Sequence, residues 1–204
     1  NAYMMTGSHH LYNYLPTKHE KWLTMIKQEI IDSGLIVDIL NAKTMEDVFR
    51  LLQGCSFLGS FLAYQYTIDM NYSPYINFSE NDFVKAGIGA IRGIKKCFLC
   101  YGNKCEDAIW YVKEHFNDLQ KRYGYTSFHP LLGHEPTLID LQNCFCETDK
   151  YLRAKMPELR IGNVRIKQKY MPHTDPIQFF FPPKWNIVEM YKYKPIVVPT
   201  LFDL

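Results

Sequence analysis

The sequence predicts an all-α fold, and three observations lead to that prediction. Apolar residues recur at helical spacing in several segments. A Thr with an acid three positions later, Thr44 and Asp47, forms the pattern of a helix N-cap. Many of the prolines, which break helices, lie beyond residue 156 and leave the preceding part of the chain free to be helical. At 204 residues the chain is long enough for one domain with its own core.

The first half predicts three helices. Residues 19–31 form the first, which ends at Ser33 and Gly34 and repeats apolar residues as one stripe. The second begins after Thr44. The third is the long apolar segment 55–70, which ends before Pro74. The apolar stripe of the first helix consists of Trp22, Leu23, Ile26, Ile30 and Ile31.

The second half predicts three more helices and then an extended tail. The helices cover residues 91–99, 106–122 and 138–154, and the last begins at Pro136 and Thr137. Residues 165–170 alternate like a short basic strand. We therefore expect a helical body over residues 1–155, with a hairpin at 85–93, and an extended Pro-rich basic tail over 156–204 that packs on the same domain.

The charge is uneven although the net charge is only +2. From Lys150 to Leu204 the chain has ten Lys and Arg against four Asp and Glu. This basic third favours an anionic partner, and the alternative is a solvated basic tail. No apolar run approaches the length needed to cross a membrane and no signal-peptide pattern is present, so we expect an intracellular protein without a membrane partner. Because the first residue is Asn1, we expect a fragment or a processed product.

Six cysteines are present, and their spacing fits no strong metal-binding template. In an intracellular protein reduced thiols are the default, and free Cys is commonly a small core residue. We therefore expect buried structural thiols, no metal site and no cofactor.

The segment 80–96 combines three glycines with an acidic approach and a basic exit. It predicts the end of one helix, a tight hairpin through Gly87 and Gly89, and a new helix whose N-terminal N–H groups suit an anion. The alternative is an ordinary glycine-rich turn between helices. The phosphate-binding residues that this prediction names are Gly87, Ile88, Gly89, Arg92, Gly93, Lys95 and Lys96.

Two helices carry polar residues that need an explanation. On the helix 138–154 an acid, an amide, a second acid and a base share one face, which either lines a cleft or is solvated with Glu147 and Lys150 as an ion pair. Gln65 and Asp69 lie one turn apart on an apolar helix, where buried polar groups require partners. The residues of the shared face are Asp140, Asn143, Glu147 and Lys150.

Four segments together resemble the alpha-glutamyl/putrescinyl-thymine pyrophosphorylase family, which includes the helical domain of the 5-hydroxymethyl-deoxyuridine DNA kinases. The segments are FLGSFLAYQYTIDMNYSP, ENDFVKAGIGAIRGIKKCF, FHPLLGHEPTLIDLQNCFCETDKYLR and FFFPPKW. The resemblance runs from about Asn1 through Trp185.

This resemblance implies a fold similar to the helix–hairpin–helix DNA glycosylases and chemistry on a modified thymine in DNA. In that chemistry an amine displaces pyrophosphate from the exocyclic methylene of 5-hydroxymethyluracil. The hairpin would hold a DNA phosphate, and Asp140 is the acid that matches the motif, with Asp69 as its rival and Glu147 as a third acid of the site. The usual glycosylase position falls near Glu106 or Asp107, neither of which reads as a buried site residue. The residues expected at the substrate base are Gln65, Tyr72, Asn143, Lys150 and Trp185.

The implied partners are double-stranded DNA with a modified or flipped pyrimidine, a kinase domain or partner subunit, and an amine donor. The implied location is the nucleus in a eukaryote or the cytoplasm of an infected cell for a phage. Two alternatives remain open, a DNA glycosylase for a modified pyrimidine and a non-catalytic DNA-binding module of a larger base-modifying assembly.

Overall fold

The computed structural model describes residues 9–125, 129, 134–160 and 181–185. All regular elements within these residues are helical, so the predicted all-α class is confirmed. The elements in chain order are η1 (His10–Tyr12), α1 (Lys18–Met25), the π-helix η2 (Ile26–Asp32), α2 (Leu35–Asn41), α3 (Met45–Gln53), α4 (Ser60–Asn71), α5 (Ile88–Cys97), α6 (Cys105–Glu114), α7 (Phe116–Arg122), α8 (Leu138–Lys155), η3 (Pro157–Leu159) and η4 (Pro183–Trp185).

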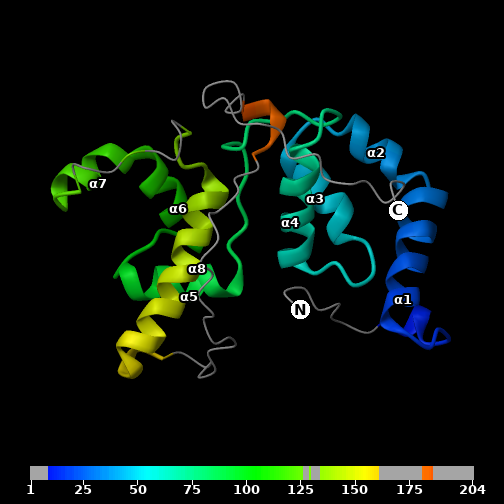
Figure 1. The fold of residues 1–204 in the computed structure, drawn as a ribbon, viewed down its shortest axis with the longest axis horizontal. Helices are drawn as coiled ribbons and strands as arrows, with labels where there is room; N and C mark the ends of the chain where they lie inside the picture. Colours follow the sequence, from blue (N-terminus) through cyan, green and yellow to red (C-terminus); the bar gives the residue numbers. More distant parts are fainter. Residues whose placement is uncertain (1–8, 126–128, 130–133, 161–180, 186–204) are drawn as a thin grey trace, which may run out of the picture.

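The helices form two groups, α1–α4 and α5–α8, joined by residues 72–87 (Figure 1). The most extensive helix contacts lie within each group: α3 packs on α4, η2 on α1 and α2, and α5 on α8. The short helix η4 lies beside the joining segment and is bonded to the end of α4 and to that segment.

Three helices begin after a Thr whose backbone N–H is accepted by an acid three residues on. At Thr17 and Thr44 the Thr side chain also accepts the backbone N–H of that acid, which completes a reciprocal capping box. The prediction that helices begin after Thr44 and Thr137 is therefore confirmed. The capping pairs are Thr17 with Glu20, Thr44 with Asp47, and Thr137 with Asp140.

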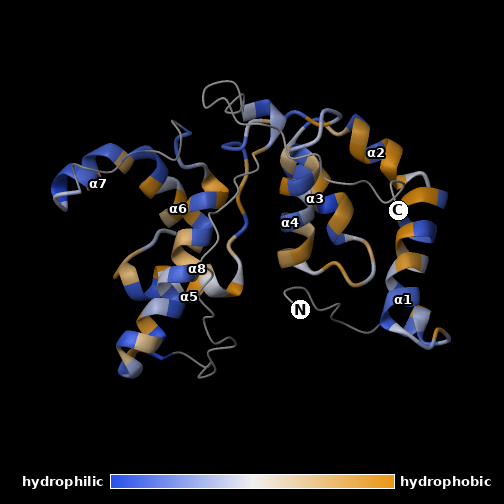
Figure 2. Ribbon diagram, in the orientation of Figure 1, coloured by the Kyte–Doolittle hydropathy of each residue, from blue (hydrophilic) through white to orange (hydrophobic). Residues whose placement is uncertain are grey.

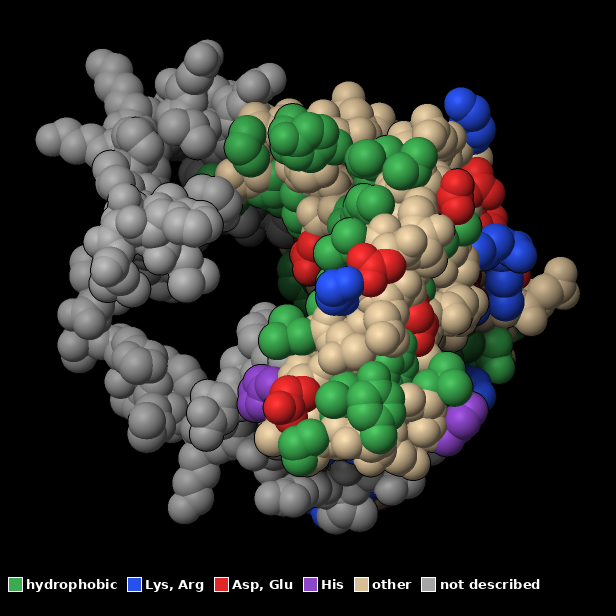
Figure 3. Space-filling view, turned by 90° about the vertical axis from the view of Figure 1, so that its right-hand side faces the viewer, with side chains coloured by type: hydrophobic (Ala, Val, Ile, Leu, Met, Phe, Trp, Pro, Cys, Tyr) green, Lys and Arg blue, Asp and Glu red, His purple; other side chains and the backbone are tan. Residues whose placement is uncertain are grey.

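The first predicted helix is longer and less regular than a single amphipathic stripe. After Met25 it continues as a π-helix, whose wider turn changes which residues face the core. Trp22 and Met25 are buried, whereas Leu23 and Ile31 are 64% and 58% exposed. Figure 3 shows apolar side chains scattered over the side of the molecule on which α1 and α2 lie. A separate helix, α2, follows Gly34 and was not predicted.

The predicted helix 55–70 begins only at Ser60, because a turn occupies the preceding residues. In this turn Phe57 adopts φ 67°, the left-handed region that residues other than glycine rarely occupy. Its ring packs at 5.5 Å on Trp22 and at 5.5 Å on Tyr12. Glu29 also holds the turn, accepting the Ser56 N–H at 2.7 Å. These contacts offset the cost of the strained backbone.

The closest approach between two helices is that of α5 to α8, and two glycines make it possible. A Cβ atom at Gly93 would lie 2.0 Å from the Phe145 carbonyl oxygen, and one at Gly89 would lie 2.4 Å from the Cys146 sulfur. Small residues four positions apart let two helix backbones approach closely, as they do here.

The predicted hairpin is therefore wrong in its geometry. Gly87 is the N-cap of α5, with φ −74°, and Gly89 and Gly93 lie within the helix. The preceding helix α4 ends at Asn71, and the residues between it and α5 form turns and extended chain. Residues 72–97 thus contain one helix rather than a helix–hairpin–helix. Gly89 and Gly93 allow α5 to pack on α8. The alternative prediction, an ordinary glycine-rich turn, does not describe this role either.

A buried ion pair lies beside the glycines and joins the same two helices. Lys96 and Asp149 approach to 2.5 Å, with side chains only 3% and 2% exposed. Arg153 also contacts Asp149, at 3.1 Å. Because charged groups in an apolar interior are stable only when paired, this contact fixes how α5 lies on α8.

The remaining predictions for the second half are partly confirmed. The helix 138–154 is present as α8, whereas the helix 106–122 is divided at His115 into α6 and α7. None of the residues of α7 is buried, and its surface is mainly hydrophilic (Figure 2). The predicted basic strand 165–170 lies outside the described residues.

Gly93→Ala is expected to lower the free energy of unfolding by about 3 kcal/mol, because a backbone oxygen cannot rotate away from the new methyl group. Gly59→Ser is the matched control. A Cβ at Gly59 meets no atom within 4 Å, and Ser is a good N-cap residue, so a change of at most about 0.5 kcal/mol is expected. Urea unfolding followed by circular dichroism measures both variants. Equal effects would contradict the packing role of Gly93.

Lys96→Met is expected to lower the free energy of unfolding by about 3 kcal/mol, because Asp149 would lose its nearest cation in a buried site and keep only Arg153. Lys150→Met removes a pair of the same length with Glu147 on the surface of α8, and at most about 0.5 kcal/mol is expected. The same urea titration compares the two. A small loss for Lys96→Met would show that the buried pair is not what joins α5 to α8.

Candidate functional site

A group of polar and aromatic side chains meets at the junction between the two helix groups. Trp185 donates its indole N–H to Glu80 at 2.7 Å and meets the ring of Tyr72 edge-on at 5.9 Å. Lys184 donates to the carbonyl oxygen of Asn71 at 2.7 Å. His134 stacks on Trp185 at 3.8 Å. We call Tyr72, Glu80, His134, Lys184 and Trp185 the junction cluster.

The pKa of Tyr72 depends on two other predicted site residues, Asp69 and Asp140. Burial raises the pKa of Tyr72, and the negative charges of Glu80, Asp140 and Asp69 raise it further. Burial lowers the pKa of Lys184, although Glu80 opposes that effect. Asp69 on α4 and Asp140 at the start of α8 thus both act on Tyr72.

Tyr72 and Trp185 are predicted to contact a substrate base, but in this structure they contact each other. Trp185 is packed between His134 and Tyr72, and its N–H is bonded to Glu80. Both rings are therefore held in the junction cluster, and a base can stack on either of them only if that packing opens.

Asp140, the acid that matches the sequence motif, caps α8. Its Oδ2 accepts the Thr137 N–H at 2.8 Å and the Thr137 hydroxyl at 2.9 Å. This contact explains why an acid occupies the position, since it satisfies one of the free N–H groups of the first helical turn.

Asp69 and Gln65 have no comparable structural task. They lie one turn apart on α4, and partial burial raises the pKa of Asp69. The Nε2 atom of Gln65 is buried and has no hydrogen-bond partner in the described part of the chain. Buried polar atoms are ordinarily paired, so the described contacts of α4 do not explain this amide. Asp69 as a whole is exposed, with only its carboxyl partly desolvated, whereas the sequence had suggested that it is buried.

Glu147, Asn143 and Lys150 are not brought to the junction cluster. Glu147 and Lys150 form an exposed ion pair at 2.5 Å, which is the structural alternative that the sequence left open. Asn143 is exposed and accepts a hydrogen bond from Gln142 at 2.8 Å. At 1.5 Å per residue, Glu147 lies about 10 Å along α8 from Asp140.

The start of α5 is exposed, and its basic residues follow further along the helix, with Lys95 in the last turn. Ile88 is 68% exposed, and no ion pair involves Arg92 or Lys95 within the described residues. The N–H of Gly87 is already bonded to the Gln142 side chain at 3.1 Å. Lys96 and Gly93 are buried against α8, which removes both from the predicted phosphate contacts.

Glu106 was dismissed from the sequence, yet it is only 6% exposed. It pairs with Lys85 at 2.9 Å and accepts the Ala86 N–H at 3.1 Å. Burial alone would raise the pKa of Glu106, but these hydrogen bonds outweigh it and lower the pKa. Glu106 thus holds the chain that leads into α5, a task for which its charge is sufficient explanation.

Sequence reasoning also missed His134, Glu80 and Lys184. Their signal is weak, because it depends on the tail segment 181–185 meeting residues about 100 positions earlier. His134 has a buried Nε2 atom that no described residue contacts by a hydrogen bond.

The described residues show no metal-binding cluster and no membrane-spanning helix. Cys97, Cys100 and Cys144 are exposed, so the expectation of buried thiols is wrong for these three. No group of His, Cys, Asp and Glu among the described residues is arranged to hold a metal ion. In the described parts of the chain, no helix has the length and apolar character needed to span a membrane.

The fold and the junction define an all-helical domain whose central helix pair is held by glycines and a buried ion pair. A family model described as "5-hmdU DNA kinase, helical domain" matches residues 1–161. The match covers most of the chain, and the chain belongs to this family. Neither a curated protein nor a solved structure matches it.

Proposed function

We propose that this chain is a DNA-binding helical domain that takes part in modifying 5-hydroxymethyluracil in DNA. The observation that carries the proposal is the family match over residues 1–161, since the family is described by a kinase that acts on 5-hmdU DNA. A kinase domain or subunit would phosphorylate the hydroxymethyl group twice to give its pyrophosphate, and the helical domain would hold the DNA.

The exposed start of α5 supports the DNA-binding part of the proposal. The first N–H groups of a helix have no partner within the helix and carry a partial positive charge, which suits a phosphate. Arg92 and Lys95 add two full charges on the same helix. Gln142 and Glu106 hold the preceding residues, so the helix end is presented in a fixed position.

The chemical step that we propose is displacement of pyrophosphate by an amine at the exocyclic methylene of the base. The amine lone pair forms the new C–N bond, the C–O bond breaks, and pyrophosphate leaves with the electron pair. The amine proton passes to Asp69, whose raised pKa makes it a better base than an ordinary Asp. The amide of Gln65 lies one turn away and can bind an oxygen of the base.

The phosphate contacts predict a change in salt dependence. Arg92→Gln with Lys95→Gln should weaken binding to duplex DNA and lower the slope of log K against log salt by about 2, since each lost phosphate contact removes about 0.9. The control, Lys18→Gln with Lys43→Gln, removes two exposed charges from the other helix group and should leave the slope unchanged. Fluorescence anisotropy over a salt series measures both. Equal slopes in the two double variants would exclude α5 as the DNA contact.

The acid assignment predicts opposite results for two carboxylates. Asp69→Asn should lower turnover of DNA bearing pyrophosphorylated hydroxymethyluracil by about 10²-fold or more and leave DNA affinity unchanged. Asp140→Ala should keep turnover and lose about 1 kcal/mol of stability through the cap. In wild type, turnover should fall as the pH drops through the raised pKa of Asp69, because a protonated carboxyl cannot accept a proton.

Mass spectrometry of the nucleosides after incubation with putrescine is the measurement. Loss of turnover in Asp140→Ala with full turnover in Asp69→Asn would reverse the assignment. Release of a free base would identify a glycosylase instead. Salt-dependent DNA binding with no product under any of these conditions would identify a binding module that serves a partner enzyme.

A further inference from the structure

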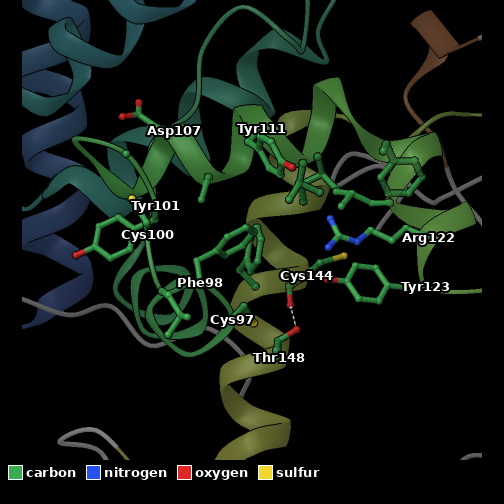
Figure 4. Close-up of a pocket in the computed structure, with 18 residues that line it drawn as sticks. Cys97, Phe98, Cys100, Tyr101, Asp107, Tyr111, Arg122, Tyr123, Cys144 and Thr148 are labelled. Carbon is green, nitrogen blue, oxygen red and sulfur yellow. Dashed lines mark hydrogen bonds between the residues drawn. The ribbon is translucent and has the colours of Figure 1, made fainter.

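A large cavity lies away from both the junction cluster and the start of α5. It is lined by the end of α5, the residues that follow it, α6, α7 and α8, it is open to solvent on one side, and its volume is about 950 Å³ (Figure 4). Small-molecule sites typically have volumes of about 300–1,000 Å³, so this cavity is of the size of a ligand site. None of the residues predicted from the sequence to bind substrate lines it.

The walls of the cavity are aromatic and fixed by contacts with one another. Phe98 meets Tyr111 at 6.4 Å and 88°, and Phe145 at 5.9 Å and 60°. Tyr111 in turn stacks on His115 at 4.4 Å. Rings held edge-to-face form a rigid wall on which a flat ligand ring can stack.

The charge of the cavity favours an anion. Arg122 extends into it beside Tyr123 (Figure 4), and no described carboxylate forms an ion pair with this guanidinium. Asp107, the acid of the lining, is already occupied, because its Oδ2 accepts the N–H groups of Asn103 and Lys104 at 2.9 and 3.1 Å. A planar guanidinium without an acidic partner suits the oxygens of a phosphate.

The polar groups of the wall distinguish a nucleobase from an alkyl chain. Tyr111 and Tyr123 line the cavity, and their hydroxyls make no hydrogen bond to any described residue. The edge of a base can pair with such hydroxyls, whereas an alkyl chain cannot.

We propose that this cavity binds a nucleobase that carries a phosphate, with the base against Phe98 and Tyr111 and the phosphate at Arg122. The nucleotide is either free or extruded from DNA, and only in the second case does this inference rest on the proposed function. Cys97 and Cys144 are exposed in the lining and report on occupancy.

Alkylation of the cysteines in the full chain tests the proposal. Iodoacetamide is used at about pH 9, because burial raises the pKa of both Cys97 and Cys144. Deoxyuridine monophosphate, or a single-stranded oligonucleotide with one 5-hydroxymethyluracil, should slow modification of Cys144 and leave that of Cys146, which faces Gly89, unchanged. Protection by the mononucleotide identifies a free nucleotide, and protection by the oligonucleotide alone identifies an extruded one.

Arg122→Gln should weaken whichever of these ligands protects Cys144 by about tenfold. Lys121 is the neighbouring charged residue on α7, and its side chain does not line the cavity. Lys121→Gln should therefore leave the protection of Cys144 unchanged. Protection by decanoate but by neither nucleotide, or equal effects of the two substitutions, would overturn the inference. Neither result would affect the salt dependence that Arg92 and Lys95 confer, so failure here is distinct from failure of the proposed function.

Discussion

The close approach of α5 to α8 is the constraint on which the rest of the second helix group depends. Gly89 and Gly93 permit it, and the buried pair of Lys96 with Asp149 fixes it. When α5 packs on α8 in this way, the side chain of Gln142 accepts the N–H of Gly87. This hydrogen bond fixes the position of the start of α5 at the surface. A larger residue at either glycine would therefore move an exposed helix end as well as a core contact, because the two are parts of one rigid helix.

The glycines thus affect a ligand only indirectly, through the position of α5. The sequence suggested that the glycines form a turn whose backbone binds a phosphate. In the structure Gly89 and Gly93 lie in the interface between α5 and α8 instead. Both interpretations place a partial positive charge at the start of α5, because this charge requires only that the helix forms and that its first turn is exposed. What the glycines contribute is the position of that charge rather than a contact with the anion.

Local rules predicted much of the fold, and non-local contacts account for what they missed. The caps at Thr44 and Thr137 depend on residues three positions apart, so they could be read directly. The strained turn at Phe57 depends on Trp22 and Tyr12, and the place of Trp185 depends on Glu80, contacts that no periodicity encodes. For the candidate site the sequence named Asp69, Tyr72, Asp140 and Trp185, whose proximity only the fold could reveal. It placed Asp140 ahead of Asp69, and it could not separate a capping role from a catalytic one at Asp140, because both roles select the same residue type.

The proposed sites together set a geometric condition on bound DNA. The start of α5 and the cavity beyond its end are separated by the ten residues of that helix, or about 15 Å at 1.5 Å per residue. Stacked bases of one strand rise about 3.4 Å each, so a strand that contacts the start of α5 can reach the cavity only several nucleotides away or by leaving the stack. Asp69, by contrast, lies on α4 in the other helix group, and its charge acts on Tyr72 at the junction. If both proposals hold, a base that reacts at Asp69 and an extruded nucleotide in the cavity belong to different parts of the domain, and the cavity then serves recognition rather than reaction.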